Sequence, residues 1–264
     1  MKLLSTENKD KQIYFLCAMP RSGNTLFASI MNQNPGLVVT PNSITLEIMK
    51  NFFLLKRTDT FQNFPDEQSL DSVMDEVYNL YYKNWPFKII IDRGPVCTPG
   101  NLKIMQKHFK KPIRCVVLVR DVLDVLASYI KWFETEPTSF LNRYKTLDEK
   151  LSQVMRKDGA VAKELISIKY LLQHPEMAVF IKHDDLVENP EQEIKKVYNF
   201  LNLSYYPHYF TNLDQITING ITYEDSIVGK NMHNIRTEKI MKVENTYKKL
   251  IPERFIKEYG HIRF

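Results

Sequence analysis

The chain has 264 residues, of which 44% are hydrophobic and 25% are charged, and these values are typical of a folded globular protein rather than a disordered one. The net charge of +5 arises from basic residues interleaved with acidic ones, which favours an ordinary solvated surface and no nucleic-acid partner. No apolar run reaches the length of a membrane span, and the polar N-terminal tail over about residues 1–11 has no signal-peptide core, so we expect a cytoplasmic protein without membrane contact.

The chain opens with a predicted buried strand and a loop that suits an anion. The apolar run over residues 13–19 has the length of a strand buried on both faces, although a run this short also fits a buried helix. Pro20 ends this run because proline has no N–H to donate, and a helical apolar pattern starts at Leu26. A strand, a loop of small residues and a helix start direct several N–H groups and the positive end of a helix dipole at one place. This predicts an anion site; the alternative is an ordinary turn in which Ser22 or Asn24 caps the helix.

Three further apolar runs are predicted strands, and helical patterns separate them. The strands cover residues 87–91, 113–119 and 178–182, and a short extended piece covers residues 38–42. The helical patterns cover residues 43–57, 64–81, 98–109, a segment from Val122, 145–173 with a break near Asp158-Gly159, 191–201 and 238–259. Residues 202–236 are rich in loop signals.

The alternation of strands and helices predicts parallel βαβ units in one α/β domain over residues 1–264. In such sheets, ligands bind at the carboxyl ends of the strands. Polar residues follow each of the four predicted strands at that edge: Arg21, Asp92, Arg93, Arg120 and His183.

The cysteine count is odd, with Cys17, Cys97 and Cys115. Two of them lie in apolar strand-like runs, where cysteine behaves as a small hydrophobic residue. We therefore predict no disulfide and no metal site.

The loop Pro20–Leu26, PRSGNTL, resembles the 5′-phosphosulfate loop of sulfotransferases that use 3′-phosphoadenosine 5′-phosphosulfate (PAPS). The family forms are PKSGTTW in cytosolic enzymes and PRSGTTL in bacterial and tyrosylprotein enzymes, and this chain follows the second with Asn24 in place of a threonine. The Walker pattern GxxxxGK[ST] is absent, which disfavours a standard nucleotide triphosphatase. The resemblance implies a P-loop-like three-layer fold with a central parallel sheet of about four to five strands flanked by helices.

The segment from Arg114 to Tyr129 resembles the 3′-phosphate-binding segment of the same family, in which a strand ends on arginine and a serine follows eight residues later. Arg120 and Ser128 keep that spacing. A guanidinium group suits phosphate because its donors form a planar fork, and eight residues bring a helical serine back to nearly the same side.

Two looser matches complete the resemblance. Residues 183–190, HDDLVENP, resemble the family segment Y-E-D-L…-N-P, and His183 takes the place of a tyrosine that lies against the adenine. Residues 226–236 occupy the place of a basic loop that closes over the nucleotide. The Arg-Lys-Gly triplet of cytosolic members is missing there, which leaves Lys230 and Arg236 as candidate cofactor contacts.

The resemblance implies transfer of a sulfuryl group from PAPS to a hydroxyl or amine of a small-molecule, carbohydrate or peptide acceptor, leaving 3′-phosphoadenosine 5′-phosphate (PAP), with no metal required. The loop residues expected at the 5′-phosphate are Arg21, Ser22, Gly23, Asn24, Thr25 and Leu26. Arginine keeps its proton at ordinary pH, so Arg21 is expected to stabilise charge on the departing oxygen and not to act as a general acid.

The general base is less visible in the sequence. Tyrosylprotein-type enzymes place a glutamate where this chain has Thr40-Pro41-Asn42-Ser43, and the histidine of cytosolic enzymes after the second strand is absent. We interpret Asp92 as the general base and Arg93 as a contact of the transferring sulfuryl group. Glu47 is the other candidate for the base. The alternative role for Asp92 is a structural ion pair.

Two other functional classes stay open at this point. One is a P-loop kinase or NTPase with a degenerate loop, and the other is a non-catalytic relative that binds PAP. The acceptor pocket is expected within residues 43–86 and 130–175. The aromatic residues there suit sugar stacking, a phenol or plain core packing: Phe52, Phe53, Tyr81, Tyr82, Trp85, Trp132 and Phe133.

Overall fold

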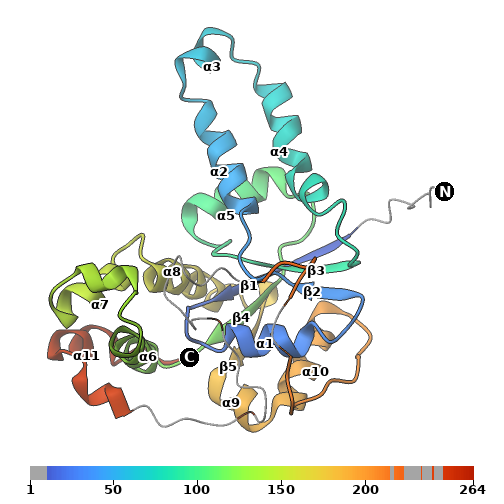
Figure 1. The fold of residues 1–264 in the computed structure, drawn as a ribbon. Coiled ribbons are helices and arrows are strands. Elements are labelled where there is room, and N and C mark those ends of the chain that lie inside the picture. The colour runs from blue at the N-terminus through green and yellow to red at the C-terminus, as the bar shows by residue number, and fades with distance from the viewer. Residues whose placement is uncertain (1–10, 215–216, 223–232, 234–239, 241–245) are drawn as a thin grey trace.

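The computed structural model describes residues 11–214, 217–222, 233, 240 and 246–264, and a five-stranded parallel sheet lies at its centre (Figure 1). The strand order is β2-β3-β1-β4-β5. The strands are β1 (Gln12–Ala18), β2 (Leu37–Val39), β3 (Ile89–Arg93), β4 (Cys115–Val119) and β5 (Ala178–Lys182). Each of these pairings is parallel, which confirms the predicted sheet and its strand number.

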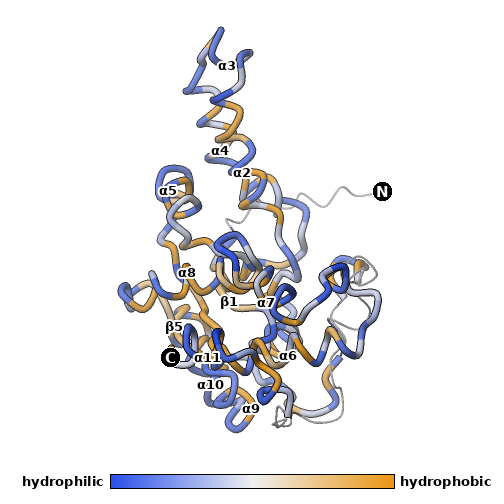
Figure 2. The backbone as a smooth tube through the Cα atoms, turned by 90° about the vertical axis from the view of Figure 1, so that its left-hand side faces the viewer, coloured by the Kyte–Doolittle hydropathy of each residue, from blue (hydrophilic) through white to orange (hydrophobic). Residues whose placement is uncertain are grey.

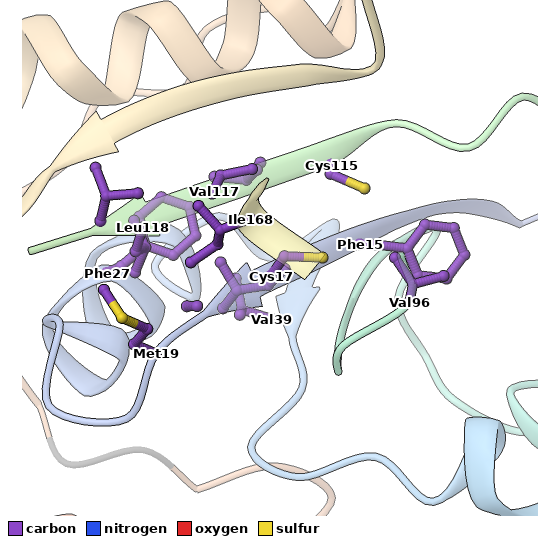
Figure 3. Packing of buried hydrophobic residues seen from close by; sticks show 14 of the residues in the cluster. Phe15, Cys17, Met19, Phe27, Val39, Val96, Cys115, Val117, Leu118 and Ile168 are labelled. Atoms are coloured by element: carbon purple, nitrogen blue, oxygen red, sulfur yellow. The ribbon is translucent and has the colours of Figure 1, made fainter. Parts of the chain in front are cut away.

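Helices cover the sheet because its strands are apolar on both faces. Helix α1 packs beside β2, α8 against β1 and α10 against β5. Figure 3 shows Phe27 of α1 and Ile168 of α8 close to Leu118 on β4, and all three side chains are buried. Full burial of one such side chain stabilises the fold by roughly 1.5–3 kcal/mol.

The helices that connect and follow the strands are short. Their bounds are α1 (Asn24–Met31), α2 (Thr45–Leu55), α3 (Asp59–Asn63), α4 (Glu67–Tyr81), α5 (Pro99–His108), α6 (Val122–Thr135), η1 (Phe140–Arg143), α7 (Leu147–Met155), α8 (Ala160–Leu172), η2 (Pro175–Met177), α9 (His183–Glu188), α10 (Pro190–Leu201), η4 (Thr246–Leu250) and α11 (Glu253–Tyr259). Within the described part of the chain, no helix combines the length and the apolar character that a membrane crossing requires.

The structure confirms one predicted helical region and corrects another. The region 145–173 divides into α7 and α8 at the predicted break near Asp158-Gly159. The predicted helix over 238–259 is wrong in its described part, which holds the 3₁₀ turn η4 and the separate helix α11. Pro252 stands directly before α11 as its N-cap; since proline donates no N–H, a continuous helix cannot pass through it.

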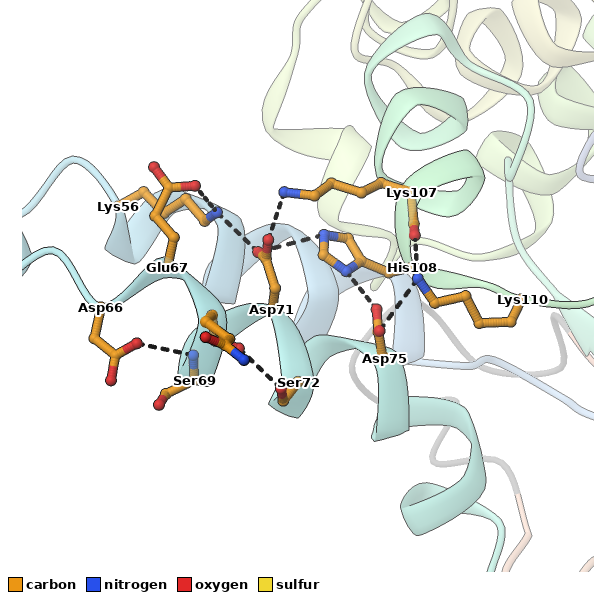
Figure 4. A network of polar contacts seen from close by, with 11 residues as sticks. Lys56, Asp66, Glu67, Ser69, Asp71, Ser72, Asp75, Lys107, His108 and Lys110 are labelled. Carbon is orange, nitrogen blue, oxygen red and sulfur yellow. Dashed lines mark hydrogen bonds and ion pairs between the residues drawn. The ribbon is translucent and has the colours of Figure 1, made fainter.

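Helices α2, α3 and α4 form a hairpin that projects from the sheet, and its α3 tip is hydrophilic (Figures 1 and 2). Figure 4 shows the ion pairs that fix α4 to α2 and α5. Asp71 contacts Lys56 at 2.8 Å and Lys107 at 2.6 Å, and Asp75 contacts His108 at 2.8 Å. The hairpin thus has a defined orientation at the edge of the sheet where β2 and β3 end.

The Asp71→Asn substitution is expected to lower the free energy of unfolding by about 1 kcal/mol at pH 6, because Asp71 pairs with two lysines while its side chain stays 24% exposed. Burial opposes ionisation of Asp71, but hydrogen bonds from Lys107 and Lys56 outweigh it and lower its pKa to about 2. The stabilisation is therefore present above the ordinary carboxyl pKa of 3.8 and is lost as the pH falls through about 2. Urea unfolding from pH 6 to pH 2 measures it.

The matched control is Asp59→Asn at the exposed start of α3. This substitution should change the free energy of unfolding at pH 6 much less than Asp71→Asn does. A difference for Asp71→Asn that persists unchanged at pH 2 would show that the effect is not electrostatic.

Candidate functional site

The loop between β1 and α1 is held in its shape by its own side chains. Ser22 is fully buried, and its Oγ donates to the carbonyl oxygen of Met19 at 2.6 Å. The Nδ2 of Asn24 donates to the same oxygen at 3.1 Å. No side chain caps the helix at Gly23, so the alternative of an ordinary turn capped by Ser22 or Asn24 is not what the structure shows. The first N–H groups of α1 are thus open to an anion.

Gly23 is required by both its backbone and its surroundings. Its φ of 94° lies in the left-handed region, and a Cβ there would stand 3.2 Å from Cδ2 of His183. His183, the first residue of α9, therefore lies directly over the loop. Arg21 also has a positive φ of 68°, an uncommon conformation for a residue with a side chain that costs on the order of 1–3 kcal/mol.

The two predicted phosphate motifs contact each other. Nη1 of Arg120 donates to the carbonyl oxygen of Arg21 at 2.9 Å, and Nε of Arg21 donates to Oγ of Ser128 at 3.1 Å. The sequence placed Arg21 at the sulfur end and Ser128 at the 3′-phosphate end of the donor. The structure brings these groups within one hydrogen bond, so Arg21 spans the two parts of the site.

These residues line a pocket of about 470 Å³ with a polar and an apolar side. The polar side carries Arg21, Arg93, Arg120, Ser128 and His183, together with Gly23, Asn24, Thr25 and Leu26 of the loop. The apolar side carries Trp132, Phe140, Leu141, Val154 and Ala160. Of the predicted cofactor contacts, Ser22 does not line the pocket because its hydroxyl is used inside the loop. Lys230 and Arg236 lie outside the described residues.

The electrostatics of the polar side favour an anion. Burial lowers the pKa of Arg21, and the charge of Arg120 lowers it further. Burial also lowers the pKa of Arg120, while Asp124, Asp184 and Asp121 raise it in part. The guanidinium groups of Arg21 and Arg120 are partly removed from water and repel each other. An anion that binds between them offsets both costs, so its binding is favourable.

The imidazole of His183 lines this pocket. Burial lowers the pKa of its imidazole, and the nearby charge of Arg120 acts in the same direction. A neutral ring beside the loop fits the predicted contact with a flat base, since stacking requires no charge.

Asp92 does not lie where its predicted role as base requires. Its side chain is 1% exposed and is absent from the lining of the pocket. The carboxylate accepts hydrogen bonds from the hydroxyl groups of Thr45 at 2.7 Å, Thr40 at 3.3 Å and Tyr82. Burial raises the pKa of Asp92, and these hydrogen bonds oppose the rise. A base must reach the proton it removes, so this geometry assigns Asp92 to the interior instead.

The hydrogen bonds around Asp92 lead to Arg93, which does line the pocket. The backbone N–H of Arg93 donates to Oγ1 of Thr40 at 2.8 Å, and its Nη1 donates to the carbonyl oxygen of Pro41 at 3.1 Å. The predicted competitor Glu47 is exposed in the first turn of α2 and does not line the pocket either. No carboxylate is found among the described residues that line it.

For the apolar side of the pocket, the sequence predicted only a broad segment, residues 130–175, and not the individual residues. This side is assembled from α6, η1, α7 and α8, all within the predicted acceptor region 130–175. Tyr129 and Asn42 were not singled out as pocket residues, although both line it. Tyr129 directly follows Ser128, a predicted cofactor contact, in the same helical turn. This adjacency could have identified Tyr129 as a pocket residue from the sequence. Burial raises the pKa of its hydroxyl to about 12, so it stays protonated.

Comparison with known proteins gives one consistent result. A family model described as a sulfotransferase domain matches residues 11–219. A Caenorhabditis briggsae protein described, provisionally, as a protein-tyrosine sulfotransferase is 23% identical over 197 residues, which cover 74% of this chain and 67% of that protein.

Two solved structures share the architecture. The sulfotransferase domain from the curacin biosynthetic pathway has 18% identity and a TM-score of 0.50, covering 96% of this chain and 92% of that one. The sulfotransferase domain of the Synechococcus PCC 7002 olefin synthase has 12% identity and a TM-score of 0.52, covering 100% of both chains. At these identities the likeness describes the fold.

Proposed function

Because this chain belongs to the sulfotransferase family, it moves a sulfuryl group from PAPS to a hydroxyl or amine acceptor, and we propose that the pocket beside the β1–α1 loop is where this transfer takes place. The observation that carries the proposal is the hydrogen-bonded series from Arg120 through Arg21 to Ser128. It joins the two anion-binding motifs into one polar wall.

In this proposal each end of the donor has its own residues. The uncapped start of α1 and Arg21 bind the 5′-phosphosulfate, and Arg120 with Ser128 binds the 3′-phosphate. His183 lies against the adenine, and Lys230 and Arg236 stay proposed nucleotide contacts. Arg93 faces the pocket and is the proposed contact of the sulfuryl oxygens.

The chemistry needs positioning and charge stabilisation. A bond forms from the acceptor oxygen or nitrogen to sulfur as the bond from sulfur to the 5′-phosphate oxygen breaks, and the acceptor loses its proton. Negative charge grows on the departing phosphate oxygen, where fixed guanidinium and N–H donors stabilise it. The apolar side chains that line the pocket lower the local polarity, which strengthens these interactions.

Two measurements test the proposal against its alternatives. Isothermal titration should show PAP binding and much weaker ATP binding; tight ATP binding that depends on Mg²⁺, with none for PAP, would favour a kinase-like enzyme. Labelled PAPS offered with hydroxyl and amine acceptors should give a labelled product. PAP binding with no turnover on any of them would favour a non-catalytic relative.

The Arg120→Ala substitution is expected to weaken PAP binding by about 10–100-fold, because it removes charge-assisted hydrogen bonds worth about 1.5–3 kcal/mol. It also removes the contact that fixes the Arg21 carbonyl. Titration calorimetry with PAP measures the loss, and Arg114→Ala is the control, since the Arg114 side chain points to the carbonyl of Phe200 instead. Equal affinities for wild type and Arg120→Ala would remove Arg120 from the site.

We also propose a reducing, cytoplasmic location. The support is that Cys17, Cys97 and Cys115 are all buried free thiols.

A further inference from the structure

A second cavity adjoins the pocket and has no role in the transfer described so far. Its volume is about 260 Å³, and it is lined by the loop Thr40–Ser43, by aromatic side chains at the end of α4, and by the turn 218–222. Asn42 lines both this cavity and the donor pocket. They share this residue just beyond the carboxyl end of β2, the end of a parallel strand at which ligands bind.

One wall of the cavity is aromatic and held in place. Tyr81 and Trp85 meet the ring of Tyr82 edge to face, with centroid separations of 4.9 and 5.0 Å. Tyr82 is fully buried and fixed by hydrogen bonds to Asp92 and Ser43. Because their packing partner is immobilised, the half-buried rings of Tyr81 and Trp85 form a preorganised wall.

The rest of the lining, here called the rim, comes from the loop Thr40–Ser43 and the turn 218–222 and combines uncharged polar side chains with Pro41, Ile218 and Ile221. Asn219 and Gly220 have φ values of 54° and 75° and form a two-residue turn that pairs Ile218 with Ile221. The exposed carboxamides of Asn42 and Asn219 make no hydrogen bond within the described part of the chain, so each has both a donor and an acceptor to offer. None of the described residues that line the cavity is charged.

This combination restricts what can bind. An acidic or basic group would lose its hydration without gaining a partner of opposite charge. A plain phenol or alkyl chain would cover the aromatic wall but would use at most one of the two exposed carboxamides at the rim. A sugar ring has an apolar C–H face for the wall and a border of hydroxyl groups, which both donate and accept, for the rim.

We propose that this cavity binds an uncharged sugar ring of the acceptor, next to the unit that receives the sulfuryl group. The inference rests on the proposed function, since it places the sugar beside the donor pocket. It narrows the acceptor from any hydroxyl or amine to a neutral glycan or glycoside with at least two units.

Binding can be measured without turnover. The chain has two tryptophans, and only Trp85 lines this cavity. With PAP bound, titration with cellobiose, lactose or diacetylchitobiose should change the intrinsic fluorescence with saturation for at least one sugar. Asn219→Gly keeps the positive φ and removes the carboxamide, and it should weaken that sugar about tenfold. Trp85→Phe should remove the signal from this cavity and leave at most that of Trp132, which lines the donor pocket. Tyr209→Ala, an exposed aromatic that does not line the cavity, should change nothing.

A rate comparison completes the test. For PAPS-dependent transfer, kcat/KM should be about tenfold or more higher for the bound disaccharide than for the methyl glycoside of its reacting sugar, and Asn219→Gly should remove that advantage. If no sugar binds, or if a phenol or tyrosine peptide binds with the same dependence on Asn219, the inference is overturned while transfer itself stands. Failure of PAP to bind would instead overturn the proposed function.

Discussion

Replacing Arg21 with alanine is expected to lower kcat by about 10²–10³, with a smaller effect on PAP affinity, because in the proposed site it removes a fixed cationic donor that stabilises the developing charge. The Arg21 guanidinium donates a hydrogen bond to Ser128, and burial lowers its pKa. Its surroundings therefore have a lower dielectric constant than water, and its interaction with a nearby negative charge is stronger. Its backbone is held at φ 68° with the carbonyl bound by Arg120. Single-turnover kinetics with saturating labelled PAPS measures the chemical step directly.

Two variants separate charge from architecture. Arg21→Lys keeps the charge but loses the planar fork of donors, so an intermediate kcat is expected. Ser128→Ala removes the hydrogen-bond partner of Arg21 but leaves the guanidinium in the pocket, so it should mainly weaken PAP. If Arg21→Ala raised only the apparent dissociation constant and kept kcat, Arg21 would be a ground-state phosphate contact and its catalytic role would be wrong.

The framework of the fold could be predicted from sequence because the signals are local. Each strand of the sheet is a short apolar run, and the order strand, helix, strand requires parallel pairing. The loop residues and Arg120 follow strand ends, so the topology alone brings them to one edge. The helix predicted over 238–259 was wrong in its described part, where apolar periodicity was given more weight than Pro252. Helices α3 and α9 were not predicted.

The details of the site depend on tertiary contacts that no local pattern records. Asp92 follows the predicted strand over 87–91, but in the structure it lies within β3. This strand runs between β2 and β1, and its end is covered by the loop before α2 and by Tyr82. Whether a strand-end side chain turns toward a pocket or into the interior depends on packing from elements distant in sequence. The same reason hides the contact between Arg21 and Ser128, which are 107 residues apart.

The Asp92→Ala substitution is expected to lower the free energy of unfolding by about 2–4 kcal/mol, because it leaves buried hydroxyl donors without their acceptor. The hydroxyls of Thr40, Thr45 and Tyr82 all point to this carboxylate. Turnover should fall as well, since Thr40 also holds the backbone of Arg93. Thermal unfolding measures the first effect, and steady-state rates on the folded fraction measure the second.

The Asp92→Asn variant distinguishes a positioning residue from a base. A positioning residue lowers stability together with kcat, and the remaining activity keeps the wild-type dependence of kcat on pH, because the group that loses the proton is unchanged. A base gives the opposite pattern: normal stability, a large loss of kcat, and the disappearance of the acidic limb of the pH profile. Because the carboxylate is buried and bonded to three hydroxyls behind the loop that carries Pro41, we expect the first pattern. A thermally unperturbed Asp92→Asn enzyme that has lost its acidic limb would restore Asp92 as the base.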